Sequence, residues 1–153
     1  MGNLETKESD MRFMIMVKAT KDTEAGKFPD NAEKLFEAMA AYHEELVKAG
    51  VLLDASGLQP SSSGWKIKYT GDKRAVVDGP FTEAKELIAG YTLIQTKTRE
   101  EALEWTRRFP KPHLEYACEI EVRQLYELED FATIEAAKDS IGKFREMETG
   151  LKK

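Results

Sequence analysis

Histidine is the residue type in this chain best suited to moving protons, and His43 is the candidate that its surroundings single out. A histidine titrates near neutral pH, so it can accept a proton and release it again. A carboxylate on one ring nitrogen would fix the tautomer and stabilise the imidazolium. Asp54 and Asp78 are both candidate partners, and the sequence does not choose between them. The alternative is that His43 is an ordinary hydrogen-bonded residue of the core.

A histidine and a carboxylate suffice for isomerisation or elimination beside a carbonyl group, without a nucleophile. Tyr91 either offers its hydroxyl to a bound molecule or packs in the core, and Phe81 is a second candidate for ligand contact. We expect no metal, because the other histidine, His113, stands in a Pro-rich segment without ligand spacing. We expect no cofactor, since no Gly-rich phosphate loop is present. The single cysteine, Cys118, is expected to be a buried, inert thiol.

His43 is positioned by a helix predicted from about residue 30 to residue 49. Asp30 and Glu33 have the spacing of a capping box at its start, and Gly50 ends it. The apolar stripe of this helix comprises Ala32, Leu35, Phe36, Met39, His43, Leu46 and Val47. His43 is therefore expected to face the interior.

Alternating hydrophobicity predicts strands before and after this helix. The predicted strands are Met11–Lys18, Val51–Leu53 with Leu58, Trp65–Tyr69, Arg74–Val77, Ala89–Lys97 and Tyr116–Tyr126. Residues 70–73 form a hairpin turn. A second capping box at Thr98 and Glu101 begins a helix that runs to about Arg108. From Phe131 onward, apolar residues at steps of three and four predict a helical tail, weakened by Gly142.

This order of elements predicts a ferredoxin-like α+β fold with helices on one face of an antiparallel sheet. The strand Met11–Lys18 is apolar on both faces, with Phe13, Ile15 and Val17 on one and Met14 and Met16 on the other. The predicted helices cover only one face of the sheet, so the apolar face with Met14 and Met16 must be buried against another surface. We therefore expect a homodimer formed through the open faces of two sheets.

Length and charge narrow the class of protein. The 153 residues suit one domain, predicted as a lead over 1–10, a folded unit over 11–131 and a tail over 132–153. The net charge of −5 argues against nucleic acid as a partner. No stretch approaches the ~20 apolar residues of a membrane span, and no signal peptide is visible, so we expect a cytoplasmic protein without a membrane partner.

One local motif resembles a known family. The run Val76-Val77-Asp78-Gly79-Pro80-Phe81-Thr82-Glu83-Ala84-Lys85-Glu86, followed by Ala89-Gly90-Tyr91, resembles the DGPF branch of the YCII-related family. The resemblance extends from Met11 to Phe131, with Gln124 standing where the family often has proline. It implies a ferredoxin-like fold that dimerises into an α+β barrel. It also implies a His–Asp centre, in which His43 matches the histidine.

Two classes of function follow from these observations. The first is a lyase or isomerase that acts on a small anionic or carbonyl-bearing molecule. The second is a non-catalytic ligand-binding or regulatory module, linked by the resemblance to extracytoplasmic sigma factor transcription. A pocket lined by His43 with a carboxylate in reach would favour the enzyme. A closed, fully apolar interior would favour the regulatory module.

Overall fold

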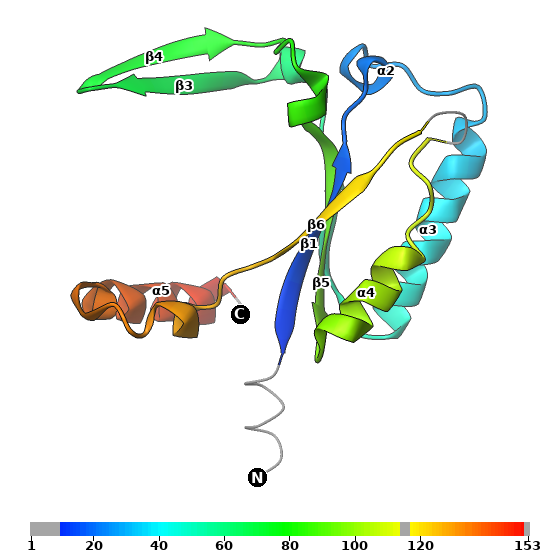
Figure 1. The fold of residues 1–153 in the computed structure, drawn as a ribbon. Helices are drawn as coiled ribbons and strands as arrows, with labels where there is room; N and C mark the ends of the chain where they lie inside the picture. The colour runs from blue at the N-terminus through cyan, green and yellow to red at the C-terminus, as the bar shows by residue number, and fades with distance from the viewer. Residues whose placement is uncertain (1–9, 114–116, 152–153) are drawn as a thin grey trace.

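The computed structural model describes residues 10–113 and 117–151, and its centre is an antiparallel sheet of four strands in the order β2-β5-β1-β6. The strands of this main sheet are β1 (Met11–Lys18), β2 (Leu52–Gly57), β5 (Ile88–Thr96) and β6 (Ile120–Gln124). Helix α3 (Ala32–Lys48) follows β1, and helix α4 (Arg99–Arg107) follows β5. Both helices lie on one side of the main sheet (Figure 1). The predicted ferredoxin-like α+β class is confirmed.

The core lies between the main sheet and these two helices. Its fully buried side chains are Ile15, Leu46 and Ile94. The remaining helical elements are α2 (Lys21–Glu24), α5 (Lys138–Leu151) and the short turns η1 (Ser61–Ser63), η2 (Ala84–Glu86), η3 (Leu128–Phe131) and η4 (Glu135–Ala137). None of the helices in the described ranges is both long and apolar enough to cross a membrane.

The helix ends match the sequence predictions unequally. At α4 the Thr98 hydroxyl accepts from the Glu101 amide at 3.1 Å, as a cap should. After α3, Gly50 takes a positive φ of 73° and stops the helix. The capping box at Asp30 was wrong, because Asn31 is the N-cap residue and makes no side-chain capping bond. The first four backbone N–H groups of a helix have no partner within the helix. At the start of α3 the Asn31 side chain accepts a hydrogen bond from none of them.

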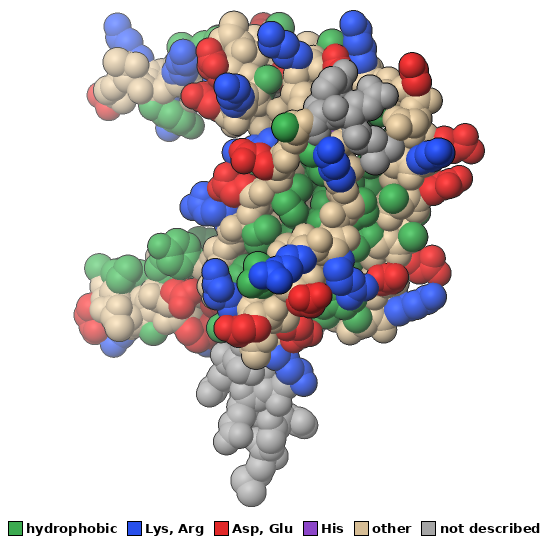
Figure 2. All heavy atoms as spheres, turned by 45° about the vertical axis from the view of Figure 1, so that its right-hand side comes forward, with side chains coloured by type: hydrophobic (Ala, Val, Ile, Leu, Met, Phe, Trp, Pro, Cys, Tyr) green, Lys and Arg blue, Asp and Glu red, His purple; other side chains and the backbone are tan. Residues whose placement is uncertain are grey.

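Two arms leave the main sheet on the side opposite α3 and α4 (Figure 1). One arm, the hairpin, consists of β3 (Trp65–Thr70) and β4 (Lys73–Asp78), which form a sheet of their own around a turn at Gly71. The other arm, the tail, comprises residues 127–151 with η3, η4 and α5. Figure 2 shows the recess between the two arms. The open face of the main sheet lies at the base of this recess.

The last strand is shorter than predicted. β6 begins at Ile120, residues 117–119 are not in a strand, and Tyr116 lies outside the described residues. The tail is helical, as the spacing of its apolar residues predicted, but the α-helix begins at Lys138 and not at Phe131. α5 continues through Gly142.

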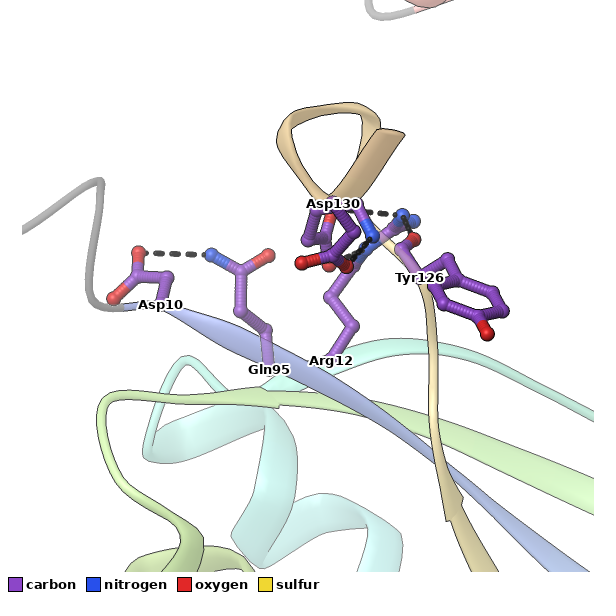
Figure 3. A network of polar contacts seen from close by, with 6 residues as sticks. Asp10, Arg12, Gln95, Tyr126 and Asp130 are labelled. Carbon is purple, nitrogen blue, oxygen red and sulfur yellow. Dashed lines mark hydrogen bonds and ion pairs between the residues drawn. The ribbon is translucent and has the colours of Figure 1, made fainter. Parts of the chain in front are cut away.

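Arg12 fastens the start of the tail to β1 (Figure 3). Its guanidinium donates two hydrogen bonds to the Glu127 carboxylate, at 2.8 and 3.0 Å. This bidentate contact raises the pKa of Arg12. The Glu127 amide in turn donates to Asp130 at 2.7 Å, which begins η3. The first residue of the tail, Glu127, is therefore bonded to β1, while α5 extends beyond the sheet.

Candidate functional site

A hollow of about 860 Å³ opens between α3, the segment after β1 and the neighbouring ends of β2 and β5. We call it the α3 hollow. Its walls are mainly apolar, and the residues that line it include Lys27, Phe28, Phe36, Met39, Ala40, His43, Tyr91, Thr92 and Phe109. His43 thus stands at a cavity and not in a sealed core. A smaller hollow adjoins it, shares Phe36 and Met39, and is lined by the buried His113.

Both ring nitrogens of His43 have hydrogen-bond partners. Nδ1 lies 2.7 Å from the Met39 carbonyl oxygen, one helical turn back along α3. Nε2 lies 2.8 Å from the Thr92 hydroxyl, on the face of β5 that the helices cover. Thr92 is only 3% exposed, so its hydroxyl is held away from water. The predicted site residue is therefore positioned by a backbone group and a strand side chain.

These two contacts fix one tautomer of the neutral ring. A carbonyl oxygen can only accept, so Nδ1 carries the proton and donates it to Met39. Nε2 then accepts from the Thr92 hydroxyl. When the ring is charged, Nε2 instead donates to the same oxygen, so both protonation states keep two hydrogen bonds. The Met39 carbonyl takes the orienting place that a carboxylate would occupy, but it brings no full negative charge to the imidazolium.

Aromatic rings hold the His43 side chain from two sides. Tyr42 and Phe109 make edge-on contacts with it, at ring-centroid distances of 5.5 and 6.4 Å. Tyr42 is buried and donates to the Trp105 carbonyl at 2.7 Å, and burial raises the pKa of Tyr42 to about 12. The predicted apolar stripe left out Tyr42. Its position directly before His43, three residues after Met39, was the signal that could have placed it on the buried side.

The structure does not bring Asp54 to His43, and a β-bulge is the reason. Leu52 pairs with Ile94, but Asp54 pairs with Leu93, so Leu53 is an extra residue in β2. In a regular ladder Leu53 would pair with Leu93, and Asp54 would stand opposite Thr92, on the face that His43 contacts. The bulge turns Asp54 to the open face of the main sheet. There its carboxylate accepts from the Tyr91 hydroxyl at 2.8 Å.

The Asp54–Tyr91 pair gives a prediction about pH. The hydrogen bond to Asp54 raises the pKa of Tyr91 above its ordinary value near 10. A raised folded-state pKa means that the pair stabilises the fold below that ordinary value and loses this effect as pH rises through the raised pKa. We expect Asp54→Asn to lower the pKa of Tyr91, read from tyrosinate absorbance against Tyr91→Phe. Asp78→Asn is the matched control and should leave the titration unchanged; an unaltered Tyr91 curve in Asp54→Asn would refute the pairing.

Asp78 and Phe81 lie at the base of the hairpin and do not line the α3 hollow. Asp78 is the exposed last residue of β4, opposite Trp65. Phe81 lies beneath the Lys66 ammonium group, which is 4.2 Å from the ring centroid. Of the residues predicted from sequence, His43 therefore lines the hollow with its ring, and Tyr91 borders the hollow from β5 while its hydroxyl bonds Asp54 on the open face. Asp54, Asp78 and Phe81 stand elsewhere. Their catalytic and binding roles stay predictions.

The turn after β4 is hydrogen-bonded to the loop around Ser61. The Ser61 hydroxyl accepts from the Phe81 amide at 2.9 Å and donates to the Glu24 carboxylate of α2. Gly79 donates its amide to the Gly64 carbonyl at 3.0 Å. A Cβ at Gly79 would lie 1.8 Å from the Ser61 carbonyl oxygen. The glycine of this motif is thus required by a close backbone approach, and the motif joins the hairpin to α2.

Lys27, Phe28 and Phe36 also line the α3 hollow. The sequence analysis placed Phe36 on the buried side of its helix and predicted no ligand contact for any of the three. Phe28 and Phe36 are largely exposed, and their ring centroids lie 5.8 Å apart. Within the described ranges no carboxylate forms an ion pair with Lys27. These residues bring one cation and two aromatic rings to the mouth of the hollow. In the same ranges, no three His, Cys, Asp or Glu side chains are grouped to hold a metal ion.

The fold and the hollow define an α+β protein with a ferredoxin-like sheet and a histidine-lined cavity on its helical side. Residues 11–145 match the YCII-related domain, so the chain belongs to that family. The match extends into the tail. A protein of Rhizobium meliloti (strain 1021), named "Uncharacterized protein R00369", is 31% identical over 75 residues. That stretch is 49% of this chain and spans 60% of the relative's length.

Proposed function

We propose that this protein binds a small molecule with an apolar body and one acidic group in the α3 hollow. The observation that carries the proposal is an open, mainly apolar cavity with His43 held on its wall by two hydrogen bonds. Ligand sites in proteins combine such walls with a few well-placed polar groups. The alternative of a closed, fully apolar interior does not describe this cavity.

The distribution of side chains suggests how such a molecule would lie. Lys27 at the mouth offers a cation to an acidic group, and the rings of Phe28 and Phe36 offer apolar surface beside it. Met39 and Ala40 continue the apolar wall along α3 toward His43. A carbonyl or hydroxyl at the inner end of the molecule would then meet the His43 ring. A compact anion with a planar apolar body meets these requirements.

A lyase or isomerase reaction is the second candidate, and the tautomer of His43 favours it. With Nδ1–H donated to Met39, Nε2 is the basic nitrogen of the ring. The Thr92 hydroxyl holds Nε2 in the resting site, so proton transfer requires the ligand to take over that hydrogen bond. The predicted aspartate partner is replaced in this scheme by the Met39 carbonyl. The Met39 carbonyl brings no full negative charge to a protonated ring, so binding alone has the stronger support.

We also assign the chain to the DGPF branch of its family, on the motif from Val76 to Glu86 and the turn that it forms around Gly79. If the chain belongs to this branch, the alternative to an enzyme is a regulatory module linked to extracytoplasmic sigma factor transcription. Both alternatives assume a cytoplasmic protein. A regulatory module would bind its ligand without turning it over. Binding in the α3 hollow is common to both, so it is the property to test.

Benzoate is a suitable probe, with benzyl alcohol as its neutral counterpart. We expect benzoate to bind the wild-type chain more tightly than benzyl alcohol does, as followed by NMR shifts of backbone amides. Ala40→Trp should fill the hollow and lower the affinity for both probes by about tenfold or more. Ala38→Trp, at an exposed α3 position outside the hollow, should leave both affinities unchanged. Lys27→Gln should remove only the preference for the anion.

Equal benzoate affinity in the Ala40→Trp and Ala38→Trp variants would overturn the proposal. Shifts spread evenly over the surface, with no group of affected residues around α3, would do the same. If benzyl alcohol binds as tightly as benzoate in the wild type, the hollow is a site for apolar molecules and the acidic group is not part of its ligand.

A further inference from the structure

The polar side chains at the His43 end of the α3 hollow have already committed their protons. The neutral His43 ring donates Nδ1–H to the Met39 carbonyl, and Nε2 accepts the proton of the Thr92 hydroxyl. A hydroxyl group has one proton, so this bond leaves only the lone pairs of the Thr92 oxygen for a ligand. A hydrogen-bond donor can use those lone pairs without breaking the existing bond.

The neighbouring hydroxyl groups are committed in the same way. Ser56 and Tyr91 border the hollow from β2 and β5. The Ser56 hydroxyl donates to the Gly57 carbonyl at 3.1 Å, and the Tyr91 hydroxyl donates to the Asp54 carboxylate at 2.8 Å. Neither proton is left for a ligand, so these two hydroxyl groups also have only lone pairs to offer.

The hollow offers protons at its other end. Lys27 and Gln59 both line the hollow, in segments that approach each other where a Cβ at Gly26 would lie 3.9 Å from Cγ of Pro60. An ammonium group has three N–H donors and no acceptor, and a side-chain amide has two N–H donors beside its oxygen. This end of the hollow therefore suits a group that accepts hydrogen bonds and carries negative charge, such as a carboxylate.

The two ends are separated by about two turns of α3. The Phe28 ring, next in sequence to Lys27, lies 5.8 Å from the Phe36 ring. Phe36 stands seven residues before His43 on α3, which is about 10 Å along the helix axis at about 1.5 Å per residue. Met39 lines the wall between them with apolar surface. The hollow is therefore an apolar cavity with proton donors at one end and lone pairs at the other.

We propose that the natural ligand of the α3 hollow is a hydroxy acid, with its acidic group at Lys27 and, at the opposite end of its apolar body, a hydroxyl group that donates to the Thr92–His43 pair. The inference rests on the proposed function and narrows it, since it selects a hydroxyl group over a carbonyl group at the inner end. A carbonyl oxygen could bond only to the Thr92 proton, and Nε2 of His43 would then lose its partner. A buried acceptor without a partner weakens binding by about tenfold or more.

Phenylpropanoates with different para substituents test the hydroxyl group, because their carboxylate and apolar body are the same. The substituents are hydroxyl, which donates, methoxy, which only accepts, and methyl, which does neither and is close to hydroxyl in size. We expect the hydroxyl probe to bind the wild-type chain about tenfold or more tightly than the methoxy probe, and more tightly than the methyl probe. Backbone amide shifts give the affinities, at a pH where the nitrogen resonances of the ring show neutral His43 with its proton on Nδ1.

Two substitutions separate the contributions of the pair. In Thr92→Val the Nε2 lone pair has no partner within the pair, so the hydroxyl probe should donate to it directly, keep its advantage over the methoxy probe and shift the Nε2 resonance. In His43→Phe the Thr92 proton is released, so the methoxy probe can accept it and the hydroxyl probe should lose its advantage. Thr96→Val is the matched control, because Thr96 is also 3% exposed on β5, lies outside the hollow and donates to the Thr98 carbonyl. It should leave the order of the three affinities unchanged.

Equal affinities of the three probes, with all of them in contact with the Met39 methyl group, would overturn the hydroxy acid and leave the binding of acids in the hollow standing. Probes that bind away from α3 would overturn the proposed function as well. A preference for the hydroxyl probe that survives in His43→Phe would contradict the role of the pair. Circular dichroism checks that each variant folds, and the Nε2 resonance in Thr92→Val gives the same test if His43→Phe does not.

Discussion

Replacing Gly79 with alanine is expected to destabilise the folded protein by about 3 kcal/mol, the upper end of the usual cost of forcing atoms into a packed site. The added Cβ would lie 1.8 Å from the Ser61 carbonyl oxygen and 2.6 Å from its carbon, both backbone atoms that cannot rotate away. The turn after β4 would have to separate from the Ser61 loop. The hydrogen bonds that join this turn to Ser61 and Glu24 would be lost with it. Urea unfolding followed by tryptophan fluorescence measures the effect.

Gly142→Ala is the matched control for this substitution. Gly142 lies inside α5, and a Cβ there would meet nothing within 4 Å. Alanine has the higher helix propensity, so this change should stabilise α5 by up to about 1 kcal/mol. A loss of unfolding free energy in Gly79→Ala and a gain in Gly142→Ala would confirm that glycine is needed at position 79 because the Ser61 backbone lies so close. A loss of less than about 0.5 kcal/mol in Gly79→Ala, the range of ordinary surface changes, would contradict the observed packing.

Leu46→Ala is expected to cost about 3 kcal/mol of unfolding free energy, because it leaves a cavity in the core one turn of α3 from His43. Leu46 is 0% exposed and packs with Ile15 and Ile94. Its neighbour Val47 is 60% exposed, so Val47→Ala should cost no more than about 0.5 kcal/mol. Chemical denaturation of the two variants compares them directly. Similar losses for both would contradict the orientation of α3 that buries Leu46 and exposes Val47.

The same pair of residues shows what periodicity can and cannot predict. The apolar pattern of α3 identified a helix and its inner side, and the structure confirms Leu46 in the core. It also predicted Val47 and Phe36 on the buried side, where the structure exposes them and buries Tyr42 instead. α3 contacts the sheet along a narrow stripe, and a pattern that leaves out Tyr42 places this stripe part of a helical turn away from its observed position.

The site could be predicted only in part, for reasons that lie in single residues. His43 was found because a titratable side chain interrupts an apolar stripe. Its hydrogen-bond partners were not predicted. One is the backbone carbonyl of Met39, which no sequence pattern marks, and the other is Thr92, which stands in a strand whose residues alternate in the usual way. Asp54 was one of two candidate partners of His43, and the extra residue in β2 that places it on the open face leaves no signal in the composition. Lys27 and Phe28 line the hollow from a loop, whose path depends on tertiary contacts.

The measurement that bears most directly on the proposed site is the position of bound benzoate, read from NMR contacts between its ring protons and isotope-labelled methionine methyl groups. The methionines report on separate surfaces. Met39 lines the α3 hollow, Met14 and Met16 lie on the open face of the sheet, and Met147 lies on α5. We predict contacts to the Met39 methyl group, lost in Ala40→Trp and kept in Ala38→Trp. Contacts to Met14 or Met16 without Met39 would contradict the proposal, because they would place the ligand on the opposite face of the sheet.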